Sequence, residues 1–317
     1  MHAAPRMNAL IASLSTILPL AGIGGAVYMQ QQNIPIAQGV GILLAFLMES
    51  ALFLATGSGA ARTRLAALPP ARLATVLTLV TPLTWLLAGG GELWQMVATT
   101  AITAFFAFWY LRFPESDAPV LLFYGALAIG KAAAVLYLMP WPKAPTAIIG
   151  EFAWLRTLLF AVLLFRRPAL TNYGFLPSKE EWRQGVKWFL LLIPAALAIG
   201  IPIGFVKVRA LPDDAVRLAL AVIGTFLGHY IFVALREEVL FRAMLLPNLQ
   251  KSLGAMAGLL ASCVIFGAVH LPNWRFALVA TVAGWFYARS YQATGSIRSA
   301  MITHALTNVV ARVFLTT

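Results

Sequence analysis

Four charged residues stand within one short stretch of an otherwise apolar part of the chain. Residues 236–242 read Arg-Glu-Glu-Val-Leu-Phe-Arg, and apolar sequence surrounds them, from Ala219 to Val233 and from Ala243 to Leu246. A charged side chain deep in lipid costs about 2.5–3.5 kcal/mol on insertion scales. Four such side chains are tolerated only if they face the protein interior and neutralise one another, which two acids and two bases can do. The fold must therefore enclose this stretch.

The two adjacent glutamates in this stretch have different neighbours on a helix. Glu238 and Arg242 are four residues apart, so they share a face and can pair. Glu237 is turned about 100° from Glu238 and has no local partner. A carboxylate of this kind inside a membrane is a candidate functional residue. The alternative is a solvated charge cluster at the end of a helix.

The composition of the chain is typical of an integral membrane protein. Of 317 residues, 61% are hydrophobic and 11% are charged, against about 25% charged in an ordinary soluble domain. At about 20 residues per span, we expect an all-α, polytopic membrane helix bundle of about eleven transmembrane helices. The net charge of +12 comes from basic residues in short connections, which is typical of membrane topology signals. No nucleic-acid partner is expected.

The apolar runs divide the chain into three predicted regions. Residues 1–167 hold about six spans, residues 168–210 hold an interfacial connector and the seventh span, and residues 211–317 form a membrane core that contains the charged stretch. The expected spans lie at about 8–29, 36–56, 73–87, 94–111, 119–138, 148–165, 188–206, 214–252, 253–270, 276–291 and 297–315. We expect a multi-pass protein of the cell (inner or plasma) membrane, with the N-terminus inside because basic residues concentrate in the connections on that side.

Three of the four histidines lie in apolar runs of the last third of the chain: His229, His270 and His304. His304 and Asn308 are four residues apart and share a helix face. A lone intramembrane histidine is more often a hydrogen-bonded packing group than a catalyst. Polar groups on the eighth, ninth and eleventh predicted helices together favour a functional site.

The spacing of Glu237 and His270 predicts that they face each other. The midpoint between them falls at Leu253-Gly254, where we expect the chain to turn. At 1.5 Å per residue, both would lie about 22–25 Å from that turn, at the same depth on antiparallel helices. Pro247 would have to be accommodated as a kink.

These motifs, in this order, resemble those of the CPBP family of CAAX-protease and bacteriocin-processing integral membrane proteins, which includes the Rce1-type prenyl-protein endopeptidases. The motifs are Glu237-Glu238-x-x-x-Arg242, Phe266-x-x-x-His270 and His304-x-x-x-Asn308. The resemblance extends from about Leu211 to the C-terminus. The first six spans have no recognised counterpart.

The resemblance implies peptide-bond hydrolysis inside the membrane without a cofactor. Glu237 would be the general base that takes a proton from water, and His270 would position that water. His304 and Asn308 would donate hydrogen bonds to the tetrahedral oxyanion. The substrate would be a membrane-embedded or membrane-anchored protein or peptide in the lipid bilayer, and the sequence leaves its identity and prenylation open.

The resemblance also assigns supporting roles and leaves one alternative mechanism. Glu238 and Arg242 would hold the helix and its electrostatics, and Phe266 would support the site. The older family interpretation is a metalloprotease, in which Glu237, His270 and His304 would hold zinc. The His-Glu-x-x-His pattern of membrane zinc proteases is absent, and an asparagine is a poor zinc ligand, so the metal-free mechanism is favoured.

Two other classes of protein remain as alternatives. One is a non-catalytic immunity or scaffold protein, which would be expected to lose a motif residue, and none is lost. The other is a transporter, for which the polar residues in the spans argue: Glu49, Lys131, Glu151 and Arg156. Interior ion pairs or snorkelling side chains account for those four residues more simply.

Overall fold

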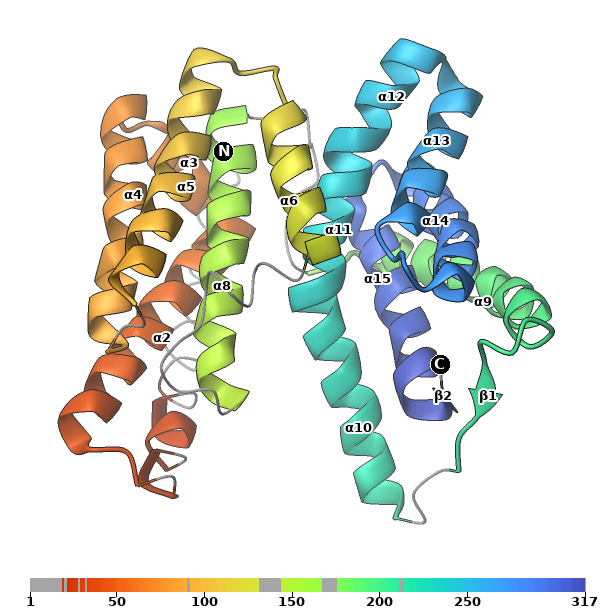
Figure 1. Ribbon diagram of the computed structural model, residues 1–317, viewed down its shortest axis with the longest axis horizontal. Coiled ribbons are helices and arrows are strands. Elements are labelled where there is room, and N and C mark those ends of the chain that lie inside the picture. Colours follow the sequence, from red (N-terminus) through yellow and green to blue (C-terminus); the bar gives the residue numbers. More distant parts are fainter. Residues whose placement is uncertain are drawn as a thin grey trace. The chain divides into compact units, whose positions relative to one another are not determined.

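The computed structural model describes residues 19, 22–27, 29–31, 33–89, 92–130, 144–166, 176–210 and 214–316. The described chain is helical except for one antiparallel pair of two-residue strands, β1 (Lys207–Val208) and β2 (Leu315–Thr316) (Figure 1). This confirms the predicted all-α class. Most of the predicted first span lies outside the described residues, as does Lys131.

The chain divides into two compact units. The first comprises residues 1–116 and 131–169, and the second comprises residues 117–130 and 170–317. The predicted division at residues 167 and 210 stays a prediction, and we describe each unit by itself.

The first unit is a bundle of apolar helices that agrees closely with the predicted spans. Its elements are α2 (Ile36–Gly57), α3 (Gly59–Ala66), α4 (Pro70–Leu87), α5 (Leu93–Arg112), α8 (Ala144–Phe160) and the π-helical segment η1 (Ala161–Arg166). The helix α3 occupies a stretch that we expected to be a connection between spans. It begins because the Ser58 side chain accepts a hydrogen bond from Ala61 N, a typical N-cap.

A fully buried ion pair lies at the centre of the first unit. Arg156 on α8 donates from Nε to Glu49 Oε2 at 2.8 Å, and both side chains are completely inaccessible to solvent. Thr84 donates to Glu49 Oε1 at 2.5 Å, and Arg156 Nη2 donates to Thr81 Oγ1 at 3.2 Å. Glu49 of α2 and Arg156 of α8 therefore neutralise each other across the bundle.

The second unit contains the remaining helices. They are α6 (Ala118–Gly130), α9 (Lys179–Gly200), α10 (Ala215–Gly228), η2 (His229–Ala234), α11 (Leu235–Glu238), η3 (Val239–Leu245), α12 (Leu246–Leu253), α13 (Ala255–Ala268), α14 (Trp274–Thr294), α15 (Ile297–Val309) and η4 (Val310–Phe314). The helix α9 begins nine residues before the predicted seventh span. Its start is set by a capping box between Ser178 and Glu181, which satisfies free backbone N–H groups.

The segment from α10 to α12 is one continuous helical stretch of 39 residues (Figure 1). It begins at Asp214, whose side chain accepts from Val216 N and Arg217 N, and it ends at Gly254 with a φ of 85°. The predicted end near Ser252 is thus confirmed. Pro247 is the second residue of α12 and lies inside this continuous stretch, directly after the change from the π-helical segment η3 to α-helix.

Three helical stretches among the described residues are long and apolar enough to cross a membrane: α2, α4 and the stretch from Ala215 to Leu253. The expected number of eleven spans stays a prediction. On α10 the large apolar residues are exposed, as expected of a face covered by lipid: Val216, Leu220, Ile223 and Leu227.

Candidate functional site

The predicted pair of Glu238 and Arg242 is present in the second unit. Arg242 Nε lies 3.1 Å from Glu238 Oε2, and both side chains are buried. The guanidinium also donates from Nη2 to the backbone oxygen of Gly284 at 3.1 Å and lies over the Phe266 ring, 4.7 Å from its centroid. Phe266 therefore supports the motif by packing against the arginine, a contact that cation–π attraction stabilises.

His304 on α15 stands between the two adjacent glutamates. Its Nδ1 lies 2.8 Å from Glu238 Oε1, and its Nε2 lies 3.8 Å from Glu237 Oε2. Glu238 is paired with a cation and is therefore an acceptor, so Nδ1 is the donor in this hydrogen bond. The two glutamates leave their helix in different directions. Both still lie near the His304 ring, because Glu238 is close to Nδ1 and Glu237 is close to Nε2.

The two glutamates differ in their access to solvent. The side chain of Glu238 is fully buried, whereas 24% of the Glu237 side chain is exposed. Both belong to α11, a four-residue α-helical interval between the π-helical segments η2 and η3. Single π turns inside α-helices are frequent at functional sites. The exposed carboxylate is thus the one that water can reach.

The helix α15 is held in register by polar contacts with its neighbours. Thr303 donates to the backbone oxygen of Gly185 on α9 at 2.9 Å and contacts Ser290 Oγ on α14 at 2.9 Å. At the start of α15, Arg298 Nη2 lies 2.7 Å from Glu181 Oε1. These contacts place His304 at the level of Glu238 on α11.

His270 lies just after the end of α13. Its Nδ1 is 2.8 Å from the backbone oxygen of Phe266, and its ring packs edge-to-face against Phe276 with centroids 4.3 Å apart. No hydrogen bond or ion pair joins His270 to Glu237 within the described residues, and the predicted role of His270 stays a prediction. Phe266 is the common neighbour of both histidines, with ring centroids 5.3 Å from His270 and 6.0 Å from His304.

Asn308 follows His304 by one turn on α15 and is partly buried. In the part of the chain that the structure describes, its side-chain amide has no hydrogen-bond partner. An amide in this state is able to donate to an incoming oxygen atom.

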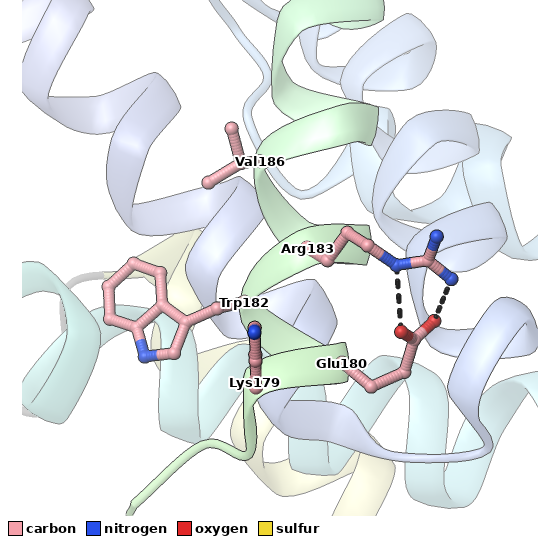
Figure 2. A pocket seen from close by; sticks show the side chains of 5 residues that line it. All are labelled: Lys179, Glu180, Trp182, Arg183 and Val186. Atoms are coloured by element: carbon pink, nitrogen blue, oxygen red, sulfur yellow. Dashed lines mark hydrogen bonds and ion pairs between the residues drawn. The ribbon is translucent and has the colours of Figure 1, made fainter.

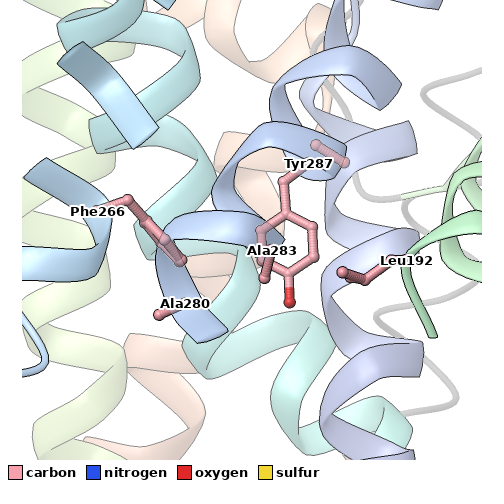
Figure 3. Close-up of a cluster of buried hydrophobic side chains, with 6 residues drawn as sticks. Leu192, Phe266, Ala280, Ala283 and Tyr287 are labelled. Atoms are coloured by element: carbon pink, nitrogen blue, oxygen red, sulfur yellow. The ribbon is translucent and has the colours of Figure 1, made fainter. Parts of the chain in front are cut away.

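Tyr287 on α14 was missed by the sequence reasoning. Its ring stacks on His304 with centroids 4.4 Å apart and an interplanar angle of 15°. It belongs to a buried cluster with Leu192, Phe266 and Ala283 (Figure 3). Nothing in the sequence marks it, since a tyrosine in an apolar helix is commonplace and no motif spacing includes it.

The described residues do not assemble the three-ligand set that the zinc alternative requires. Glu237 and His304 are neighbours, but His270 directs one ring nitrogen to a backbone oxygen and does not join them. We therefore derive no step through a metal.

A surface hollow of about 630 Å³ lies along the first turns of α9 (Figure 2). Its lining residues are Lys179, Glu180, Trp182, Arg183 and Val186. Hydrogen bonds from Arg183 lower the pKa of Glu180 to about 2. The hollow is lined by one helix and contains no motif residue, so we place no substrate there.

Comparison with known proteins identifies the region that carries these residues. No curated protein and no solved structure matches the chain. The family model of type II CAAX prenyl endopeptidase Rce1-like proteins matches residues 219–310, under a third of the chain, and all seven motif residues lie inside the match. This confirms the resemblance predicted from the motifs and, with the apolar helices, a membrane protein. Residues 219–310 are therefore similar to the type II CAAX prenyl endopeptidase Rce1-like family.

Proposed function

We propose that the chain is an intramembrane endopeptidase of the CAAX-processing type, in which Glu237 activates the attacking water. The observation that carries this proposal is His304 held between Glu238 at one ring nitrogen and the more accessible Glu237 at the other. This arrangement lies inside the region that matches the Rce1-like family. It combines a candidate base with a preoriented hydrogen-bond donor.

In the proposed reaction, the Glu237 carboxylate takes a proton from water, and the water oxygen attacks the scissile carbonyl carbon. The carbonyl oxygen becomes an oxyanion that accepts hydrogen bonds from the Asn308 amide and from His304 Nε2–H. Because Nδ1 donates to Glu238, this step requires His304 in its imidazolium form, with a proton on both ring nitrogens. The carbon–nitrogen bond then breaks, and the proton held by Glu237 passes to the leaving amine. His270 would position the water.

Glu238 and Arg242 support this chemistry indirectly. Glu238 accepts from His304 Nδ1 and so leaves Nε2 on the side of Glu237, whose Oε2 lies 3.8 Å away. Arg242 neutralises Glu238, which would otherwise be a lone buried charge. We propose a membrane-anchored or membrane-embedded protein or peptide as the substrate, and no nucleic-acid partner.

Cleavage of defined peptides tests the proposal. Purified protein in lipid nanodiscs is given internally quenched peptides that end in cysteine, two aliphatic residues and methionine, with the cysteine S-farnesylated or free. We expect the wild type and Glu115→Gln, which changes an exposed carboxylate, to cleave at equal rates, and Glu237→Gln to be inactive. Cleavage by Glu237→Gln at the wild-type rate would overturn the assignment of the base.

The same assay separates the alternatives. A non-catalytic immunity or scaffold protein, or a transporter, would leave every peptide intact. For metal dependence, we expect activity to survive exhaustive chelation, with no stoichiometric metal by elemental analysis. One zinc per chain, lost and restored together with activity, would favour the metalloprotease mechanism.

A further inference from the structure

Tyr287 is a large aromatic residue against the proposed catalytic histidine, and the proposed reaction gives it no role. We propose that Tyr287 is a positioning residue that fixes the plane of the His304 imidazole and thereby the direction of Nε2. This inference rests on the proposed function and goes beyond it, because it identifies a determinant of the site outside the sequence motifs.

A planar ring needs two constraints to be fixed in space. The hydrogen bond from His304 Nδ1 to Glu238 Oε1, 2.8 Å long, lies in the ring plane and leaves rotation about its own axis free. The stack on Tyr287, with centroids 4.4 Å apart and planes 15° from parallel, removes that rotation. Phe266 meets the same ring edge-on, at 6.0 Å and 83°. Together these contacts leave one orientation for Nε2.

The Tyr287 side chain is itself held in one position by its neighbours, so it can fix the orientation of the His304 ring. It is 2% exposed and belongs to the buried cluster that includes Leu192 of α9. Its ring meets Phe266 of α13 at 5.8 Å and 82°, and the Arg242 guanidinium lies 5.5 Å from its centroid. In Figure 3 the ring lies between Phe266 and Leu192. Contacts from four other helical segments therefore fix its position.

The geometry assigns the positioning of the His304 imidazole to the ring face of Tyr287 and not to its hydroxyl. The contact with His304 is made by the ring face, which stacks on the imidazole. Stacked aromatic pairs at this separation attract each other. A displacement of about 1 Å in a catalytic group is enough to reduce turnover about 10²-fold.

Variants at position 287 test the two parts of the side chain separately. Tyr287→Met and Tyr287→Leu remove the ring, and Tyr287→Phe removes only the hydroxyl. Tyr291→Met is the matched control, because Tyr291 lies one turn further on α14 and makes no ring contact with His304 within the described residues. We measure kcat and KM with the farnesylated quenched peptide, together with the melting temperature.

We expect kcat to fall about 10²-fold in the two ring-less variants, with KM unchanged. Tyr287→Phe should keep most of the wild-type kcat, and Tyr291→Met should equal the wild type. A kcat loss in Tyr287→Phe as large as in Tyr287→Met would overturn the proposal, as would unchanged kcat in folded ring-less variants. Failure of both ring-less variants to fold would also overturn it, since Tyr287 would then be required for the stability of the core and not specifically for the orientation of His304.

Failure of the proposed function and failure of this inference give different results. If the wild type cleaves no peptide, the proposed function fails before position 287 is tested. If the wild type cleaves and the ring-less variants cleave equally well, only the inference about Tyr287 fails.

Discussion

Glu238 Oε1 accepts a hydrogen bond from His304 Nδ1 at 2.8 Å, across 66 positions of the chain. The same carboxylate neutralises Arg242 through its other oxygen, Oε2. Glu238 therefore has two roles. It neutralises the buried Arg242 within the α10–α12 stretch, and it orients the His304 ring on α15. Glu237, one residue earlier, lies 3.8 Å from the other ring nitrogen of the same histidine, and 24% of its side chain is exposed.

The two glutamates should respond differently to the same substitution. Glu238→Gln leaves Arg242 buried without its counter-charge, which typically lowers the free energy of unfolding by about 3–5 kcal/mol. The glutamine oxygen can still accept from His304, so we expect stability to fall more than the chemical step. Glu237→Gln should melt near the wild-type temperature and abolish turnover. The measurement is the melting temperature in detergent beside peptide turnover.

A double substitution sharpens this comparison. In Glu238→Leu/Arg242→Met both charges are gone, so much of the lost stability should return, but His304 loses its acceptor and turnover should remain low. The base would be assigned to the wrong residue if Glu237→Gln stayed active while folded Glu238→Gln did not.

Asn308 should matter for rate and little for stability. Its amide has no hydrogen-bond partner among the described residues, so removing it breaks no internal hydrogen bond. We expect Asn308→Ala to lower kcat about 10²–10³-fold, as for one lost oxyanion donor, with an unchanged melting temperature. Asn308→Asp keeps the shape and removes the donor, so it should lose a similar factor. Full activity in Asn308→Asp would exclude the amide as a donor.

Local spacing predicted the local parts of the site. The pairing of Glu238 with Arg242 follows from four residues on one helix face, and this pairing is confirmed. The contact of His304 with Glu238 could not be predicted, because it depends on the relative height of two helices. That height is set by polar contacts such as Thr303 with the Gly185 backbone and Arg298 with Glu181.

The same limit applies to the first unit. The sequence favoured interior pairs or snorkelling for Glu49 and Arg156, and the structure gives a direct bond between them across 107 positions. The partner could not be named, because the helix neighbours were unknown. The helix α9 begins before the predicted seventh span for another reason. The apolar run starts at Trp188, whereas the helix starts at the capping box of Ser178.

The ion pair of the first unit should contribute strongly to stability and contribute nothing directly to catalysis. Glu49→Gln leaves the fully buried Arg156 without a counter-charge, and we expect a loss of about 3–5 kcal/mol in the free energy of unfolding. Glu49→Leu/Arg156→Met should recover most of it. Glu115→Gln, at an exposed carboxylate, is the control. A melting temperature unchanged in Glu49→Gln would show that the pair is dispensable.

The approach of α9 to α15 requires a glycine at position 185. A Cβ there would lie 2.6 Å from Ile302 Cβ and 2.9 Å from the backbone oxygen of Ser299. Gly185→Ala should therefore push α15 away and cost about 1–3 kcal/mol of stability, and turnover should fall because His304 moves with the helix. A Cβ added at Gly224 on α10 would meet no atom within 4 Å, so Gly224→Ala should stabilise slightly. Equal melting temperatures in the two variants would contradict this.

The clamp between Glu181 and Arg298 should make stability depend on pH. Burial acts to raise the pKa of Glu181, but hydrogen bonds from Ser296 and Ser178 and the charge of Arg298 hold that pKa below its usual range. The stabilisation is therefore complete above the unfolded value of about 4.3 and is lost as the pH falls through the lower folded value. We expect the melting temperature of Glu181→Gln to lie below that of the wild type at pH 7, and the gap to narrow below about pH 4.3. A gap that stays constant during acidification, while Glu115→Gln follows the wild type, would rule out the clamp as the titrating element.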